Sequence, residues 1–199
     1  MLQRIARLWL AILTVCTLCL TASPSSAQDF YDSGQVSVAI ERGFGIHYST
    51  RTVDPPDDEF AYTSIGLGWA GAISAFHHSR AAIDFFVVDQ LSLGGSIGFF
   101  TQSGDAETNG FIISPRVGYA IPLNRTFSFW PRGGITYIDI DNSNVLALSG
   151  EAMFVASPRP GWGILLGLTL DLGFTGEQGD SDATEFALGF PSVGIMGTF

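Results

Sequence analysis

The chain has 199 residues, 46% of them hydrophobic, and a formal net charge of −10. This acidity excludes the usual nucleic-acid binders, which neutralise phosphates with a basic surface. Mean hydropathy is +0.30, as in a membrane protein, yet no stretch after residue 20 reaches the ~18 apolar residues of a membrane-spanning helix. A membrane-spanning β-barrel is the remaining option, because lipid tolerates only helices and closed sheets.

The first residues have the pattern of a secretory signal peptide. Arg4 and Arg7 precede an apolar run at 8–20, and small residues follow up to a predicted cleavage site after residue 27. We therefore expect residues 1–27 to be removed and residues 28–199 to form one outer-membrane β-barrel domain. Loss of the two arginines changes the net charge from −10 to −12.

Both cysteines of the chain, Cys16 and Cys19, lie inside this leader. A lipoprotein anchor at Cys16 is an alternative, but Val15 precedes it where a small residue is expected. With cleavage after residue 27, the mature chain has no cysteine and can form no disulfide.

Apolar and polar residues alternate along the mature chain, as in strands that expose one face to lipid. Eight such segments are predicted, at 35–49, 80–88, 91–101, 111–121, 126–138, 145–156, 162–174 and 184–199. Short connections alternate with longer or more polar ones, as periplasmic turns alternate with external loops. An even number of strands then places both termini in the periplasm. A ninth alternating stretch, 62–69, is interpreted as part of the first external loop or as an extension of the sheet above the membrane.

The last hairpin shows the lipid-facing pattern most clearly. In its first arm, leucine and isoleucine residues alternate with glycine and polar residues between Trp162 and Phe174. Aromatic residues at both ends of a strand are typical of the two membrane interfaces. We expect Trp162, Phe174 and the terminal Phe199 to be interface aromatics. The same counting puts Arg42 on the apolar face of the first strand, where a β-bulge at residues 41–42 or snorkelling would be needed.

Six charged residues fall on the inward face of these strands. They are Glu41, Asp84, Arg116, Arg132, Glu151 and Asp171. Eight strands leave an interior that side chains just fill, and buried charges must be paired. We therefore predict a salt-bridged polar network that plugs the lumen. A proton or ion path through the same residues is the alternative.

Histidines offer two weaker hypotheses. His77 and His78 are predicted to lie in a solvated external loop, and a metal site there is the alternative. His47 and Ser49 share one strand face, as in the His-x-Ser pair of some lipid A deacylases, although Thr50 follows where that family has asparagine. Neither pattern is specific, so we expect no metal, no cofactor and no enzyme activity.

The predicted external loops are acidic. Their carboxylates are Asp54, Asp57, Asp58, Glu59, Asp105, Glu107, Asp139, Asp141, Glu177, Asp180 and Asp182. No spacing among them matches a calcium-binding loop. A solvated negative surface is expected, and bridging by divalent cations to anionic lipopolysaccharide is the functional alternative. The apolar end of the first loop, 65–72, is expected to pack on the extended sheet.

The signal peptide, the eight segments, the hairpin of 84–94 and the terminal Phe199 together resemble the small outer-membrane β-barrels, such as the OmpA transmembrane domain, OmpX and OmpW. The stretches 41–45 and 130–137 look like those of myxobacterial barrels. The resemblance implies the outer membrane of a Gram-negative bacterium, contact with lipid and lipopolysaccharide, and recognition of the C-terminal strand by the barrel-assembly machinery. It covers the mature chain but is not specific for activity.

Three functions remain open from the sequence. The first is a monomeric, non-enzymatic barrel with a structural or surface-interaction role. The second is a conduit for small hydrophobic molecules, as the OmpW-like resemblance implies. The third is a lipid A-modifying enzyme that uses His47 and Ser49.

Overall fold

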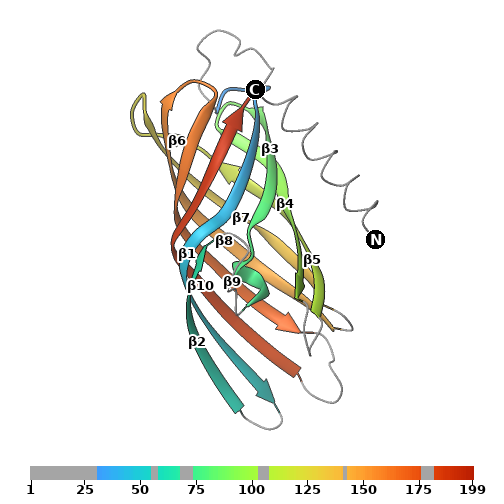
Figure 1. Ribbon diagram of the computed structural model, residues 1–199. Helices are drawn as coiled ribbons and strands as arrows, with labels where there is room; N and C mark the ends of the chain where they lie inside the picture. The colour runs from blue at the N-terminus through green and yellow to red at the C-terminus, as the bar shows by residue number, and fades with distance from the viewer. Residues whose placement is uncertain (1–30, 55–57, 68–73, 103–107, 141–142, 176–181) are drawn as a thin grey trace, which may run out of the picture.

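The computed structural model describes residues 31–54, 58–67, 74–102, 108–140, 143–175 and 182–199. The predicted signal peptide lies outside them. The chain forms a single antiparallel sheet that closes on itself (Figure 1). Its elements are β1 (Val36–Asp54), β2 (Asp58–Leu67), the 3₁₀ helix η1 (Ala75–His77), β3 (Arg80–Val88), β4 (Leu91–Gln102), β5 (Thr108–Tyr119), β6 (Ile121–Pro122), β7 (Phe127–Ile140), β8 (Ser143–Arg159), β9 (Trp162–Thr175) and β10 (Asp182–Thr198).

Eight of these strands make the closed barrel. They follow the order β1, β3, β4, β5, β7, β8, β9 and β10, and β10 pairs back onto β1 from Ser37↔Thr198 to Asp54↔Asp182. Phe199 completes the seam, because its backbone exchanges two hydrogen bonds of 3.0 Å with Val36. The prediction of an eight-stranded antiparallel barrel is confirmed.

The strands alternate as the sequence predicts. In β3, Ile83 and Phe85 are exposed on the outer face, whereas Asp84 and Phe86 are buried inside. Short turns join strands at one end of the barrel, which we call the turn end; the C-terminus lies there too (Figure 1). The opposite end, which carries the β1–β2 hairpin, is called the loop end. The periplasmic position of the termini stays a prediction.

The β1–β2 hairpin extends the sheet at the loop end. β1 has 19 residues, well beyond the ~9–11 that a membrane-spanning strand needs. One edge of β1 pairs first with β3, over Val36–Glu41, and then with β2, over Phe44–Val53. β2 is therefore not a ninth barrel strand. Of the two interpretations of 62–69, the extension of the sheet is the one observed, and it begins at residue 58; its position above the membrane stays a prediction.

The wall has an unpaired sector near the loop end. β4 pairs with β3 only as far as Ile97, and its last five residues, 98–102, pair with β5 alone among the described residues. Within the described ranges, β2 likewise pairs with β1 alone. Figure 1 shows η1 between β2 and the β4–β5 hairpin in this view, and its residues Phe76 and His77 are buried.

Candidate functional site in the barrel interior

A charged cluster crosses the middle of the barrel. Four arginines and four carboxylates contribute to it from six strands, and all are buried or nearly so. They are Glu41 and Arg42 on β1, Arg80 and Asp84 on β3, Arg116 on β5, Arg132 on β7, Glu151 on β8 and Asp171 on β9. The structure thus brings together all six residues singled out from the sequence, and adds Arg42 and Arg80.

Arg116 is the centre of the cluster. Its Nη1 lies 2.6 Å from Glu41 Oε2, and its Nη2 lies 2.5 Å from Asp84 Oδ2. Its Nε also donates to Asp84 Oδ1 at 3.0 Å. One guanidinium therefore links β1, β3 and β5, with the planar, bidentate geometry that makes arginine suitable for buried pairs.

Arg132 closes the cluster on the opposite side. Its Nη1 lies 2.5 Å from Glu41 Oε1, and its Nη2 lies 2.7 Å from Glu151 Oε2. Its guanidinium carbon also sits 4.6 Å from the ring centre of Trp130, a cation–π contact. Glu41 is thus shared by two arginines.

A β-bulge turns Arg42 into the interior. Its φ is +54°, and the β1–β10 register shifts between Ile40 and Phe44. Both Glu41 and Arg42 consequently point inward, which confirms the predicted bulge and corrects the placement of Arg42 on the apolar face. Its Nη1 lies 2.7 Å from Asp171 Oδ2.

Hydroxyl groups satisfy the remaining side of Asp171. Ser149 Oγ donates to Asp171 Oδ1 at 2.5 Å, and Thr136 Oγ1 lies 2.6 Å from Ser149 Oγ. Ser114 Oγ continues the row, 2.8 Å from Thr136. The row runs across β5, β7, β8 and β9, so this carboxylate is both ion-paired and hydrogen-bonded, as a buried charge requires.

An apolar layer fills the turn end. Its buried members are Ala39, Ala82, Phe86, Ala120, Trp130, Val155, Leu165 and Met196, and Tyr31 packs against them. The rings of Phe86 and Trp130 lie 5.6 Å apart, and Trp130 Nε1 donates to Ser92 Oγ at 3.2 Å. These two large inward side chains are therefore in contact inside the barrel.

A second apolar layer lies between the charged cluster and the loop end. It contains Ile112, Ile138, Val145, Ala147 and Ala187 from the wall, with Phe76 of η1 at its centre. Phe76 belongs to the segment 74–79, which we call the inner segment. The sequence assigned this segment to an external loop, and that assignment is wrong: Phe76 and His77 are buried inside the barrel.

The histidines are also placed differently from the prediction. The His77 ring stacks on His47 with 4.1 Å between ring centres, and His78 stacks on Phe100 at 4.3 Å. The solvated loop expected for His77 is therefore incorrect. In the described part of the chain, no group of three or more His, Cys, Asp or Glu residues is arranged to hold a metal ion.

The His47–Ser49 pair is present on one inward face, but it lacks the third member of a catalytic triad. Both residues are buried. His47 Nδ1 has no hydrogen-bond partner among the described residues, so no carboxylate orients the imidazole. The geometry gives this pair no support as a hydrolase site.

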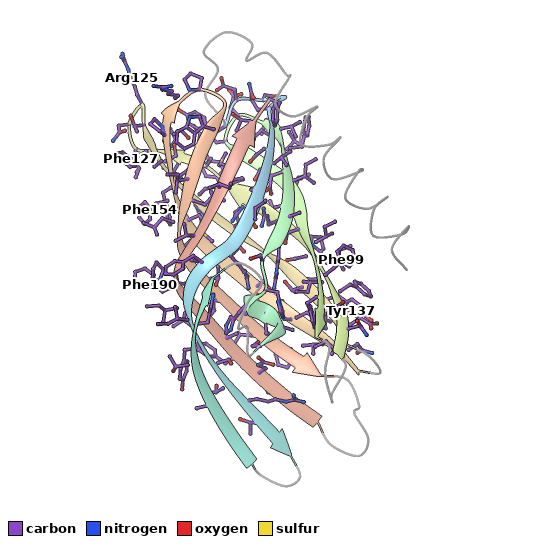
Figure 2. All side chains as sticks on the ribbon, viewed as in Figure 1. Phe99, Arg125, Phe127, Tyr137, Phe154 and Phe190 are labelled. Atoms are coloured by element: carbon purple, nitrogen blue, oxygen red, sulfur yellow. The ribbon has the colours of Figure 1, made fainter. Side chains whose placement is uncertain are left out.

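Large apolar side chains cover the outer face. Figure 2 labels Phe99, Phe127, Phe154 and Phe190, which point away from the barrel. Trp162, Phe174 and Phe199 are exposed on the same face. From Trp162 to Phe174, β9 extends about 40 Å, or about 30 Å along the axis of a barrel whose strands tilt by ~40°. That height fits a bilayer core, and the position of the three aromatics at its interfaces stays a prediction.

Two residues of the cluster could have been found from the sequence, and one feature could not. Arg80 alternates with Asp84 and Phe86 along one strand, so counting in twos puts it inside. Arg42 follows Glu41 directly, and two adjacent charges in a strand signal a bulge. The inward turn of the inner segment has no local signal, because it depends on the space that the opposite wall leaves.

Comparisons with solved structures agree with this architecture. The N-terminal β-barrel domain of Pseudomonas aeruginosa OprF is 12% identical with a TM-score of 0.50, over 84% of this chain and 98% of that one. Neisserial surface protein A is 11% identical with a TM-score of 0.50, over 84% and 98%. AlkL, determined in lipid bilayers, is 10% identical with a TM-score of 0.51, over 89% and 95%. The fold is that of the small outer-membrane β-barrels.

The resemblance stated from the sequence is thus confirmed at the level of the fold. No protein-family model and no curated protein sequence matches the chain. The described residues also contain no helix long and apolar enough to cross a membrane. At identities this low, the shared fold carries no residue-level function from one barrel to another.

Proposed function

We propose that the chain is an integral outer-membrane β-barrel of a Gram-negative bacterium, with a plugged lumen and a structural or surface-interaction role, and that it is not an enzyme. The observation that supports this most is the filled interior. An apolar layer, a charged cluster and a second apolar layer follow one another along the axis. A barrel of eight strands has no further room for an aqueous channel.

The external surface is then the part of the protein that interacts with other molecules. The β1–β2 hairpin and the loop end carry acidic residues, including Asp54, Asp58, Asp139 and Asp182. Other predicted loop carboxylates, such as Asp105 and Asp180, lie outside the described residues. Such a surface suits divalent cations that bridge it to lipopolysaccharide. Assembly through the C-terminal strand fits the seam that Phe199 completes.

A second candidate is a conduit for small hydrophobic molecules. The specific observation in its favour is the unpaired sector between β2 and the end of β4, where the inner segment enters the barrel. A path from the lumen to the bilayer would have to pass this sector, and the segment would have to move.

Cysteine labelling in whole cells tests the location and orientation. The chain has no cysteine after Cys19, so single substitutions give unambiguous signals. Thr52→Cys places an exposed thiol on β1 at the loop end, and Arg125→Cys places one in a turn at the opposite end. We expect a membrane-impermeant maleimide to label Thr52→Cys in intact cells and Arg125→Cys only after lysis. The reverse pattern would invert the topology, and no labelling of either in intact cells would contradict an outer-membrane location.

A further inference from the structure

Two buried guanidinium groups converge on one backbone carbonyl. Arg42 Nη1 and Arg80 Nη2 both donate to Phe76 O, Arg80 at a distance of 3.2 Å. Arg42 also has Asp171 as an ion-pair partner, at 2.7 Å. Arg80 is 2% exposed and makes no ion pair with a carboxylate in the described part of the chain. A neutral carbonyl therefore occupies the place where a buried cation calls for an anionic oxygen.

Other polar groups on the fixed wall near the same place lack partners. Arg80 Nε, His47 Nδ1 and Thr169 Oγ1 are buried and have no hydrogen-bond partner among the described residues. His47 Nδ1 and Thr169 Oγ1 both lie next to Gly189, because a Cβ added to that glycine would come within 3.0 Å of each atom. Each of these groups is therefore available to hydrogen-bond with a polar ligand that reaches this part of the interior.

The ring of Phe76 fills an apolar recess next to these groups. Its walls are Ile112, Ile138, Val145, Ala147 and Ala187. Gly173 makes the recess deep enough, because a Cβ at that position would lie 2.7 Å from Phe76 Cζ. Phe76 is 1% exposed, so the recess and the ring match closely.

Within the described part of the chain, the inner segment that delivers Phe76 is held by side-chain contacts and not by pairing with a strand: besides the two bonds to Phe76 O, His77 stacks on His47 and His78 stacks on Phe100. Ser74 Oγ donates to Glu185 Oε1 at 2.5 Å, and Ser79 Oγ donates to the carbonyl of Arg42 at 3.0 Å. It also lies at the unpaired sector of the wall, between β2 and the end of β4. The segment can therefore be displaced without breaking the barrel's backbone ladder.

We propose that this part of the interior is a binding site for a small organic acid, a monocarboxylate with a compact aromatic or branched apolar body, and that the inner segment occupies the site when no ligand is bound. The carboxylate bridges Arg42 and Arg80 in place of Phe76 O, because its negative charge and two oxygens bind guanidinium groups more strongly than a single neutral carbonyl does. The apolar body takes the recess of the Phe76 ring. This inference goes beyond the proposed structural role and does not depend on the external surface.

Removal of the intramolecular occupant tests the proposal. The probe is 3-phenylpropionate, titrated calorimetrically against the folded full mature chain in phosphatidylcholine vesicles. We expect Phe76→Ala to bind it about tenfold or more tightly than the wild type, because the ligand no longer competes with the ring. The uncharged 3-phenylpropan-1-ol has the same body, and we expect no comparable gain for it.

Two further variants distinguish recognition of the carboxylate by the arginines from a general loss of packing in the interior. Ser79→Ala frees the inner segment but keeps both arginines and the recess, so it should tighten 3-phenylpropionate binding in the same direction as Phe76→Ala, by less. Phe76→Ala with Arg80→Gln should lose the gain. If that double variant does not fold, as judged by heat-modifiable gel migration, the acid-to-alcohol comparison in the other two variants still decides.

A linear acid tests the shape of the site. Decanoate partitions into the bilayer and is too long for the recess of one phenyl ring, so we expect 3-phenylpropionate to bind more tightly, and tighter binding of decanoate would contradict a compact apolar body. Equal binding of acid and alcohol, or no tightening by either Phe76→Ala or Ser79→Ala, would overturn the proposal.

Discussion

Replacing Arg116 with alanine is expected to lower the free energy of unfolding by about 3–5 kcal/mol, because it strands buried carboxylates. The Arg116 side chain is 4% exposed and lies 2.6 Å from Glu41 and 2.5 Å from Asp84. Without it, Asp84 keeps only a distant contact with Arg132, at 3.8 Å. The low dielectric of the filled interior makes an unpaired carboxylate there expensive.

Urea unfolding in lipid vesicles, followed by tryptophan fluorescence, measures this effect. Arg125→Ala is the matched control, since it removes the same charge from an exposed turn that Figure 2 shows at the end of the barrel. We expect the control to change stability by less than about 0.5 kcal/mol. Equal losses of unfolding free energy in the two variants would show that Arg116 in the cluster contributes no more to stability than an exposed arginine does.

Replacing Leu168 with arginine is expected to lower the free energy of unfolding by about 2–4 kcal/mol, the cost of an arginine at the bilayer midplane. Leu168 lies halfway along β9, on the outer face between Leu166 and Leu170. Its neighbour Thr169 is 1% exposed on the inner face. An arginine at 168 would therefore point out of the barrel, whereas one at 169 would point into the interior.

The control for this prediction is Thr52→Arg. Thr52 is exposed on β1 near the loop end, so its arginine reaches water and should cost about 0–1 kcal/mol. The same urea assay, repeated in vesicles of two bilayer thicknesses, gives the comparison. If both arginines cost the same in both bilayers, the outer face around Leu168 does not contact the hydrocarbon core.

The wall of the barrel was predictable from the sequence because its signal is local. Alternation places β3 at residues 80–88 as observed, and it puts Glu41, Asp84 and Arg116 on one interior face. These positions need only the two-residue period of a strand and a single closed sheet. The bulge at Arg42 also has a local signal, since two adjacent charges cannot both face inward in a regular strand.

The contents of the loop-end half were not predictable, because they depend on tertiary space. Phe76 and His77 belong to a long connection between strands, and such connections usually lie on the surface. Their burial requires the gap that Gly173 leaves on β9 and the carbonyl acceptor that Arg42 and Arg80 need. Neither requirement can be seen until the two sides of the barrel are opposed.

The filled interior is the central claim, and single-channel recording in planar bilayers tests it most directly. Trp130 and Phe86 close the turn end, the ion pairs of Arg116 and Arg132 cross the middle, and Phe76 fills the layer beyond. The wild-type protein is therefore predicted to insert without a stable porin-scale conductance. A large, steady, ion-selective current from the wild-type barrel would contradict this account and assign the protein to the channels.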